Sequence, residues 1–466
     1  MKINGCLKRA AALAMSVCVL FGVTGCSDGG KKAANKDVKV VTIWSTDSHS
    51  KDVYQDAINE WNNTTGKEKG IEIEYIVKEG DTLNQSIEVA LQSGDAPELF
   101  TGGNAMRLAE SKYIIPLEDI PGSEELLKKY EPVIRPGKLS EKYNGTYTLP
   151  VAVTTQALVY NKDMFKAAGL VDKKGNPTPP KTYEELREYA KKLTNPKKKE
   201  YGIILPMKWS GWFNHDIAYA MMASAGHPGW NPVEGKYEYD KLIPIAETFM
   251  GIKKDNSYYP GAESLDNDAA RARFAAGGVG MKFAMSFDVG VYNDQFPADI
   301  NWGVAPVPVL DTKDTYMQRS QTSVLPWINS KALETVGAEA ILEVYKFLAS
   351  DEFMIKKLNA GVELPIFSEL IDKADFKNAK KGWKEFAELL KISETYPNTP
   401  SNDSSKISAA MQDRFVNEVW SGKISAKQMI NEYTAEVNTA TTAYYEAHTD
   451  EKLDTFILAD WNTKRK

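Results

Sequence analysis

The stretch "VKVVTIWSTDS", residues 38–48, carries the first strong structural signal of this chain. Its first seven residues are mostly β-branched and end in an aromatic ring, which is typical of a buried strand. A polar segment follows, and then Val53, Ala57, Ile58 and Trp61 recur at helical spacing. The pattern predicts a strand, a loop at its carboxyl end and a helix.

The same order is repeated along the chain. "IEIEYIV" (71–77) predicts a second strand, residues 82–92 predict a helix, and "APELFTGG" (96–103) predicts a short strand with a glycine loop. Strands that alternate with helices indicate an α/β fold with a largely parallel sheet. Because such sheets bind ligands beyond the carboxyl ends of their strands, the strand-end loops are the first places to look for a site.

Later segments continue this pattern. "YTLPVAVTTQALVYNKDMF" (147–165) predicts a β-rich run and a helix start, and "PKTYEELREYAKKL" predicts a helix. Thr182 is placed to cap that helix, and Glu185 three residues later completes a capping box. Residues 335–349 and 404–445 are also expected to be mainly helical.

The first 25 residues have the pattern of a secretory signal peptide. Three basic residues precede an uncharged run over residues 10–24, which is too short to span a bilayer as a stable helix. The following "VTGC" resembles the bacterial lipobox. This resemblance implies that residues 1–25 are removed by cleavage before Cys26 and that the sulfur of Cys26 carries lipid. An ordinary signal peptide with an incidental cysteine is the alternative. Residues 26–37 are polar and rich in Gly, Lys and Ala, which is typical of a flexible tether.

The composition and the missing motifs argue against several classes of function. Cys6 and Cys18 lie in the predicted leader, so Cys26 would be the one cysteine of the mature chain and no intramolecular disulfide could form. The formal net charge of −6 argues against nucleic acid and against adsorption to anionic lipid. No complete metal-ligand, nucleotide-binding or serine-hydrolase motif is found, and we expect no metal, no cofactor and no catalytic residue.

Eight segments together resemble the extracytoplasmic solute-binding proteins of ABC importers, the family that includes maltose-binding protein. The resemblance rests on their order and spacing over nearly the whole mature chain. They are "VTIWSTDS", "SGDAPELFTGGNA", "YNGTYTLPVAVTTQALVYNKDMFKAAGL", "PKTYEELREYAKKL", "FAAGGVGMKFAMS", "WGVAPVP", "VYKFLASDEF" and "WSGKISAKQMINE".

The resemblance implies a two-lobed, periplasmic-binding-protein-like α/β fold, in which each lobe is a sheet flanked by helices and crossover strands form the hinge. It places lobe 1 at 38–152 plus 325–366 and lobe 2 at 153–324 plus 367–466. It also implies a monomeric receptor that is anchored by lipid at the extracytoplasmic face of the bacterial cell membrane. Such a receptor would capture a sugar, here expected to be an oligosaccharide, and deliver it to the permease subunits of an ABC importer.

The first candidate ligand contacts lie in two strand-end loops. Trp44, Asp47 and Ser48 follow the first predicted strand, although Trp44 could pack in the core and Asp47 could cap a helix. Thr101 and Asn104 belong to the glycine loop, where Asn104 offers both a donor and an acceptor. Sugar-binding members of the family often have an aromatic residue and an aspartate near this loop, and this chain departs from that pattern.

A second group of candidates lies at and after the first crossover. Thr155 and Gln156 are at the crossover itself, and Trp209, Trp212 and Asp216 are in the loop "KWSGWFNHD". The family's sugar-stacking aromatic residues occur in the region that matches this loop. We expect Trp212 to be the main stacking residue, with core packing as its alternative, while Asp216 would anchor hydroxyls or cap a helix.

Three further aromatic residues complete the set of candidates. Phe287 matches a stacking position of the family. Trp230 would contact ligand or pack within its own loop, and Trp327 would contact ligand or pack at the hinge.

Aromatic rings with nearby Asp, Asn and Gln side chains suit sugars, because pyranose rings present apolar C–H faces and hydroxyl groups together. Two alternatives remain. Asp47, Asp216 and Asp288 would also suit a polyamine, and other solutes such as a peptide belong to the same alternative. A cell-surface glycoside hydrolase is the rival from another class, since the separation of a carboxylate pair cannot be read from a sequence.

The first testable prediction concerns Cys26. Replacing the nucleophilic sulfur in Cys26→Ser should release the protein from the membrane fraction or leave it unprocessed, which fractionation and mass spectrometry of the product would show. A variant that is cleaved and retained like the parent would contradict lipid attachment at this residue.

Overall fold

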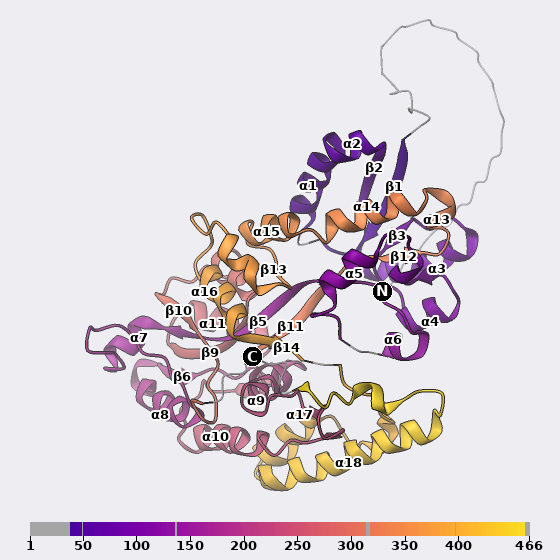
Figure 1. Cartoon of the computed structure of the whole chain (residues 1–466). Coiled ribbons are helices and arrows are strands. Elements are labelled where there is room, and N and C mark those ends of the chain that lie inside the picture. The colour runs from indigo at the N-terminus through magenta and orange to yellow at the C-terminus, as the bar shows by residue number, and fades with distance from the viewer. Residues whose placement is uncertain (1–37, 49, 136–137, 314–316, 397, 462–466) are drawn as a thin grey trace, which may run out of the picture. The chain divides into compact units, whose positions relative to one another are not determined.

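The computed structural model describes residues 38–48, 50–135, 138–313, 317–396 and 398–461. The predicted signal peptide, Cys26 and the tether lie outside the described residues. Within them the chain forms two larger sheets and a two-stranded sheet, with helices packed against them (Figure 1).

The first sheet has the strand order β2-β1-β3-β12-β4. Strand β1 pairs in parallel with β2 and β3, whereas β12 joins antiparallel from a much later part of the chain. The strands predicted near residues 38–44, 71–77 and 96–103 are therefore confirmed. The bounds are β1 (Lys39–Ser45), β2 (Ile71–Val77), β3 (Leu99–Phe100), β4 (Ile114–Ile115) and β12 (Trp327–Asn329).

Helices from both ends of the sequence pack with this sheet. Figure 1 shows the orange helices α14 and α15 beside the indigo helix α1. The predicted inner face of α1 is confirmed for Ala57, Ile58 and Trp61, which are buried, while Val53 is partly buried. The bounds are α1 (Lys51–Asn63), α3 (Gly80–Ser93), α4 (Ala105–Glu110), α14 (Ala338–Leu348) and α15 (Asp351–Asn359).

The second sheet is built around β5, all of whose residues are buried. Its order is β14-β11-β5-β9-β6, and β10 and β13 also pair with β5. Pairs of β5 with β9, β10, β11 and β13 are antiparallel, so this sheet is mixed rather than largely parallel as the pattern suggested. The bounds are β5 (Pro150–Asn161), β6 (Tyr201–Ile203), β9 (Val279–Met285), β10 (Trp302–Ala305), β11 (Met317–Val324), β13 (Leu364–Pro365) and β14 (Ser393–Thr395).

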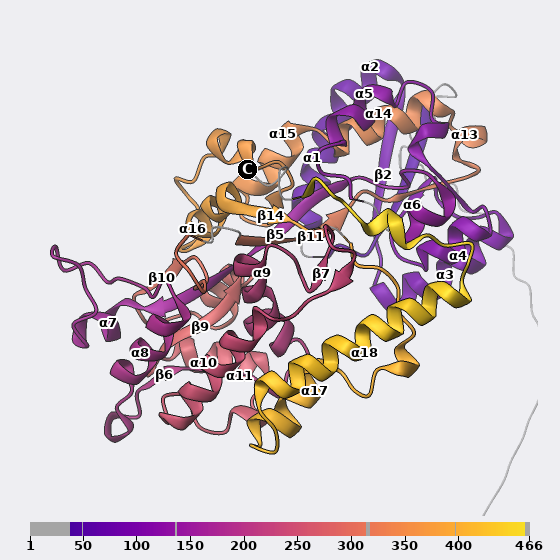
Figure 2. The same ribbon diagram turned by 60° about the horizontal axis from the view of Figure 1, so that its bottom comes forward.

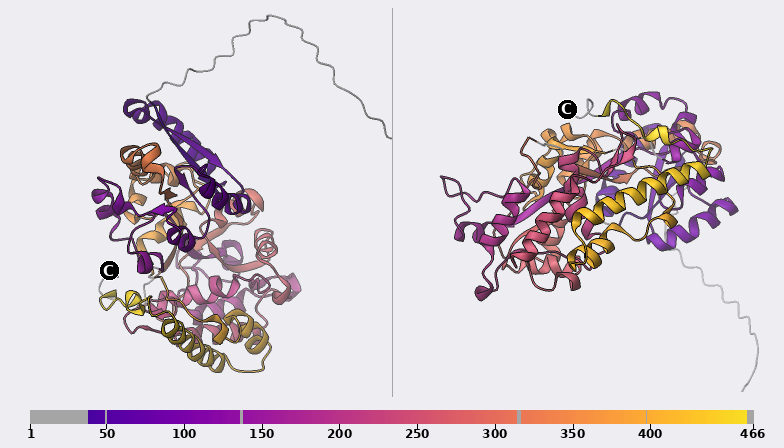
Figure 3. Two further views of the ribbon diagram at one scale, coloured as in Figure 1. Left: turned by 90° about the vertical axis from the view of Figure 1, so that its right-hand side faces the viewer. Right: turned by 90° about the horizontal axis from the view of Figure 1, so that it is seen from below.

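Helices pack against this second sheet, among them α8 on β6 and α11 on β9. Figures 2 and 3 show the long yellow helix α18, which contacts α10 and the short helix α17. The bounds are α7 (Lys162–Ala167), α8 (Tyr183–Leu193), α9 (Tyr219–Ala225), α10 (Leu242–Lys254), α11 (Asn267–Ala275), α12 (Asp288–Gly290), α16 (Trp383–Glu388), α17 (Met411–Arg414) and α18 (Ala426–Ala447).

The predicted cap of α8 is present with one change. The Thr182 hydroxyl accepts the Glu185 N–H at 3.2 Å, as expected. The Glu185 carboxylate, however, accepts the N–H of Lys181 at 2.6 Å. The side chain thus reaches one residue further back than in a standard capping box.

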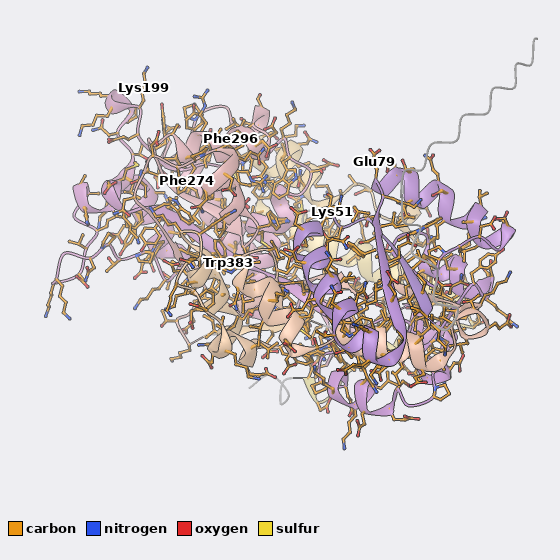
Figure 4. All side chains as sticks on the ribbon, turned by 90° about the horizontal axis from the view of Figure 1, so that it is seen from above. Lys51, Glu79, Lys199, Phe274, Phe296 and Trp383 are labelled. Atoms are coloured by element: carbon orange, nitrogen blue, oxygen red, sulfur yellow. The ribbon has the colours of Figure 1, made fainter. Side chains whose placement is uncertain are left out.

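The largest hydrophobic cluster contains residues from both sheets. It extends from Val41 on β1 through Val153 on β5 to Phe274 and Trp383, two residues labelled in Figure 4. Strand β5 also begins inside the predicted lobe 1 segment and ends inside the predicted lobe 2 segment. The exact division into lobes stays a prediction.

Gly202 on β6 provides a test of how closely β6 and α8 pack. A Cβ at this position would lie 2.1 Å from the carbonyl oxygen of Ala190, and neither backbone can move without disturbing its element. Gly202→Ala should therefore lower the free energy of unfolding by about 1–3 kcal/mol, measured by urea denaturation.

Gly290 on α12 is the matched control, since a Cβ there would have its nearest neighbour at 4.0 Å and the backbone is already helical. Gly290→Ala should leave stability unchanged or slightly increased. Equal stability of the two variants would show that the β6–α8 contact is looser than described.

Candidate functional site

A cavity of about 210 Å³ lies at the carboxyl ends of β1 and β3. Its wall combines hydroxyl groups, one carboxylate and two tyrosines with apolar residues. The lining residues are Ile43, Ser45, Thr46, Asp47, Tyr54, Tyr75, Thr101, Ser323, Val324, Leu325, Pro326 and Leu348.

Hydrogen bonds between the two strand-end loops shape this cavity. The Thr101 hydroxyl accepts the Thr46 N–H at 2.9 Å, and the Ser45 hydroxyl accepts the Asp47 N–H at 3.0 Å. Tyr54 and Tyr75 stack with ring centroids 5.3 Å apart. The structure therefore brings the predicted residues Asp47 and Thr101 to one cavity.

Asp47 and Ser48 differ in what they contact. One Asp47 carboxylate oxygen accepts the N–H of Ser50 at 3.1 Å, directly before α1. This oxygen therefore has the role expected from the helix-capping alternative. Ser48 is exposed.

The other candidates near the first sheet, Asn104, Trp327 and Trp44, make contacts within the protein. Asn104 is exposed and caps α4, since its side-chain oxygen accepts the Arg107 N–H at 3.1 Å. The Trp327 indole N–H donates to the carbonyl of Gly102 at 3.1 Å. Trp44 is partly buried, with the Lys78 ammonium 3.8 Å from its ring centroid.

Thr155 and Gln156 lie on β5 and are buried. The Thr155 hydroxyl donates to the carbonyl of Phe386 at 3.0 Å, which is a structural contact. The Gln156 amide donates to the carbonyl of His215, while its side-chain oxygen has no hydrogen-bond partner among the described residues. Gln156 thus joins β5 to the π-helix Phe213–Ala218, which contains Asp216, so the second half of the predicted loop is helical.

The structure corrects the expectation for Trp212. Its ring is 0% exposed and contacts Phe213, Phe249 and Phe415, with centroid distances of 6.1, 6.5 and 5.8 Å. The polar loop turns this ring inward, onto aromatic residues that come from distant parts of the chain. Trp212 therefore packs in the core in this conformation and presents no face to a ligand.

The remaining aromatic candidates, Trp230, Trp209 and Phe287, differ in how much of the side chain is exposed to solvent. Trp230 is buried and its indole N–H donates to the carbonyl of Phe456 at 2.9 Å, which agrees with the packing alternative. Trp209 is partly buried, with its ring centroid 4.6 Å from that of His215. Phe287 is 50% exposed, and it is the candidate whose ring is most open to solvent.

Charged groups that the sequence did not reveal as a cluster lie close to Phe287, and two of them, Lys282 and Asp288, are buried. Arg271 and Asp288 form an ion pair with an N–O distance of 2.5 Å. Lys282 is buried, and its ammonium donates to the carbonyl of Phe283 at 2.9 Å. Only the Asp268–Arg271 spacing on α11 could have hinted at this cluster, because the other members meet through tertiary packing.

These charges shift the pKa values of their neighbours. Burial raises the pKa of Asp216 to about 7, while the Lys282 ammonium lowers it and Asp288 raises it. Burial lowers the pKa of His215 to about 4, against the opposing effect of Asp288. Burial lowers the pKa of Lys282, against the opposing effect of the Asp288 and Asp216 carboxylates.

Among the residues that the structure describes, no group of three or more His, Cys, Asp and Glu side chains is arranged to hold a metal ion. None of the described helices is both long and apolar enough to cross a membrane.

Comparison with known sequences gives one family over most of the chain. Residues 47–355 match the family described as bacterial extracellular solute-binding protein. The chain is 26% identical to the maltotriose-binding protein of Pyrococcus abyssi over 315 residues, which are 66% of this chain and 63% of that protein. It is also 26% identical to the sn-glycerol-3-phosphate-binding periplasmic protein UgpB of Escherichia coli (strain K12), over 58% of this chain and 60% of that protein.

Solved structures share the fold. The cyclic alpha-maltosyl-1,6-maltose binding protein from Arthrobacter globiformis superposes with a TM-score of 0.64 at 15% identity, covering 87% of this chain and 100% of that one. The maltose/maltodextrin-binding domain MalE from Bdellovibrio bacteriovorus bound to maltotriose gives a TM-score of 0.56 at 19% identity, covering 86% and 99%. The expected periplasmic-binding-protein-like fold is confirmed.

The raised pKa of Asp216 predicts a pH-dependent stability. Between about pH 4 and pH 7 the folded chain holds a proton on Asp216 that the unfolded chain releases, so this contribution to the free energy of unfolding falls as pH rises through that window. His215 contributes in the opposite direction, because its pKa is lowered. Asp216→Asn should therefore gain stability relative to the parent as pH rises from 4.5 to 7.5, measured by urea denaturation.

Asp56→Asn, at an exposed position of α1, is the control and should keep the difference from the parent constant with pH. The same constant difference for Asp216→Asn would show that Asp216 is ionised throughout this range in the folded chain.

Proposed function

Because this chain belongs to the family of bacterial extracellular solute-binding proteins, we propose that it captures a carbohydrate and delivers it to an ABC importer. The carbohydrate is an oligosaccharide in this proposal, and lipid on Cys26 holds the receptor at the extracytoplasmic face of the cell membrane. The relatives named above are binding proteins, and we propose that this chain likewise does no covalent chemistry and acts as a monomer.

The half-exposed ring of Phe287 is the observation that carries the proposal. A large apolar side chain left open to solvent at the end of a strand costs hydration free energy unless a partner covers it. A sugar ring can do so with its C–H face, while its hydroxyl groups bond to nearby polar side chains. The hydroxyl-lined cavity at the ends of β1 and β3 offers such groups on the first sheet.

The charge balance favours a neutral ligand. Asp288 is paired with Arg271, and the Lys282 ammonium partly offsets the effect of burial on the pKa of Asp216. Two of the three acids that could have recognised a polyamine, Asp216 and Asp288, are therefore partly or fully compensated within the protein, and so are Arg271 and Lys282, the cations of this cluster. Neutral hydroxylated compounds therefore suit Phe287 and the hydroxyl-lined cavity better than a polyamine or a phosphate does.

A thermal-shift panel tests the proposal directly. Maltotriose, maltotetraose and α-D-tagatose are suitable probes, with sn-glycerol 3-phosphate and spermidine as representatives of the ionic alternatives. A compound that binds only the folded chain raises its Tm. A shift by spermidine or by the phosphate alone would contradict the carbohydrate assignment, and the appearance of new reducing ends would favour the hydrolase.

The contact role of Phe287 gives a quantitative prediction. Phe287→Ala should weaken carbohydrate binding about 5- to 150-fold, corresponding to a stacking contribution of about 1–3 kcal/mol, measured by titration calorimetry. The Tm should change little, because half of the ring is already in solvent.

Val89→Ala removes an exposed apolar side chain from α3 and serves as the control, with unchanged affinity expected. A Phe287→Ala variant with parental affinity would exclude Phe287 as a stacking surface.

A further inference from the structure

Arg271 makes three contacts, two of which join it to the segment around Phe287. Its guanidinium lies 2.9 Å from the Asp268 carboxylate and 2.5 Å from the Asp288 carboxylate. The same guanidinium is 5.8 Å from the centroid of the Phe287 ring, within the range of a cation–π interaction. The Arg271 and Asp288 side chains are only 14% and 2% exposed, so solvent weakens the ion pair between them little.

The two residues that flank Phe287 are anchored to buried groups. The Ser286 hydroxyl is hydrogen-bonded to the Thr154 hydroxyl at 2.8 Å. The Asp288 carboxylate accepts the Met285 N–H at 2.9 Å. These bonds hold the backbone on both sides of Phe287, which leaves the rotation of the exposed ring as the main remaining freedom.

The contacts of Arg271 can restrict the rotation of the Phe287 ring. A planar guanidinium can bond to two carboxylates and lie against an aromatic ring at the same time, whereas a lysine ammonium acts as a point charge. The other buried cation in this region, Lys282, instead donates to the Phe283 carbonyl. Arg271 is therefore the group whose position couples the Asp288 anchor to the ring.

We propose that Arg271 is a positioning residue that fixes the orientation of the Phe287 ring, so that this ring is a preformed stacking surface for carbohydrate. The proposal rests on the proposed function, since it assigns a role within the same carbohydrate site. A ring that is already ordered loses less conformational entropy when ligand binds, and this increases affinity without a direct contact between Arg271 and the sugar.

This mechanism has a consequence that a general structural role does not share. If Arg271 acts through the ring, changing Arg271 has no further effect on affinity once the ring has been removed. If it merely stabilises the fold around the site, its loss weakens binding by the same factor with or without Phe287.

A double-mutant cycle distinguishes these cases. The variants are Arg271→Lys, Phe287→Ala and the double variant, titrated calorimetrically with maltotriose, or with maltotetraose if maltotriose does not bind. Arg271→Lys keeps the positive charge beside Asp288, which guards against unfolding caused by an unpaired buried carboxylate. It should weaken binding about 5- to 30-fold in the parent and less than about 2-fold in the Phe287→Ala background.

Arg187→Lys is the control, because Arg187 on α8 also forms an ion pair, with both of its contacts to the Asp255 carboxylate after α10, at 2.8 and 3.3 Å. It should leave affinity unchanged in both backgrounds. Equal weakening by Arg271→Lys in the two backgrounds, or parental affinity of Arg271→Lys, would overturn the proposal while the carbohydrate function stands.

A measurement without ligand gives a second readout. With 4-fluorophenylalanine at position 287, the ¹⁹F resonance should be shifted and broadened by Arg271→Lys and unchanged by Arg187→Lys. An unchanged resonance in the Arg271 variant would also overturn the proposal. If the unaltered protein binds no carbohydrate of the panel, the proposed function and the role of Arg271 in it both fail.

Discussion

The complete burial of β5 is the constraint on which the rest of the structure depends. Each backbone N–H and C=O group of a buried strand needs a hydrogen-bond partner, and unpaired groups would cost free energy. Strand β5 obtains its partners from β9, β10, β11 and β13, which come from four separate later segments of the chain. Satisfying one buried strand therefore brings distant sequences into a single sheet.

The position of Phe287 follows from this pairing. Gln156 on β5 is opposite Met285 at the end of β9, and the chain continues directly into Ser286 and Phe287. Hydrogen bonds from this end of β9 to β5 leave the Phe287 side chain outside the packed layer. The aromatic ring is exposed because the strand ends there, and it is held in place because its neighbours remain attached to β5.

Burying charges close to the ring requires that they compensate one another. Asp288 is only 2% exposed, and its carboxylate forms an ion pair with Arg271 and accepts the Met285 N–H. Asp216 is buried and has no ion pair among the residues that the structure describes, and burial raises its pKa. The same pairing leaves little net charge for an ionic ligand to recognise.

The sequence alone determined the local structure of this protein. The β-branched run before Trp44, the alternating residues 71–77 and the cap at Thr182 predicted elements that the structure contains, because these signals depend on neighbouring residues. The order of the family motifs also predicted the fold correctly. Only the tertiary structure decided which aromatic side chain is open. Trp212 and Phe287 were both candidates for stacking, yet the ring of Trp212 packs against Phe249 and Phe415, whereas Phe287 is 50% exposed. The cluster of Arg271, Lys282 and Asp288 was likewise decided by packing, since burial and charge pairing depend on residues that are far apart in the chain and meet only in the folded state.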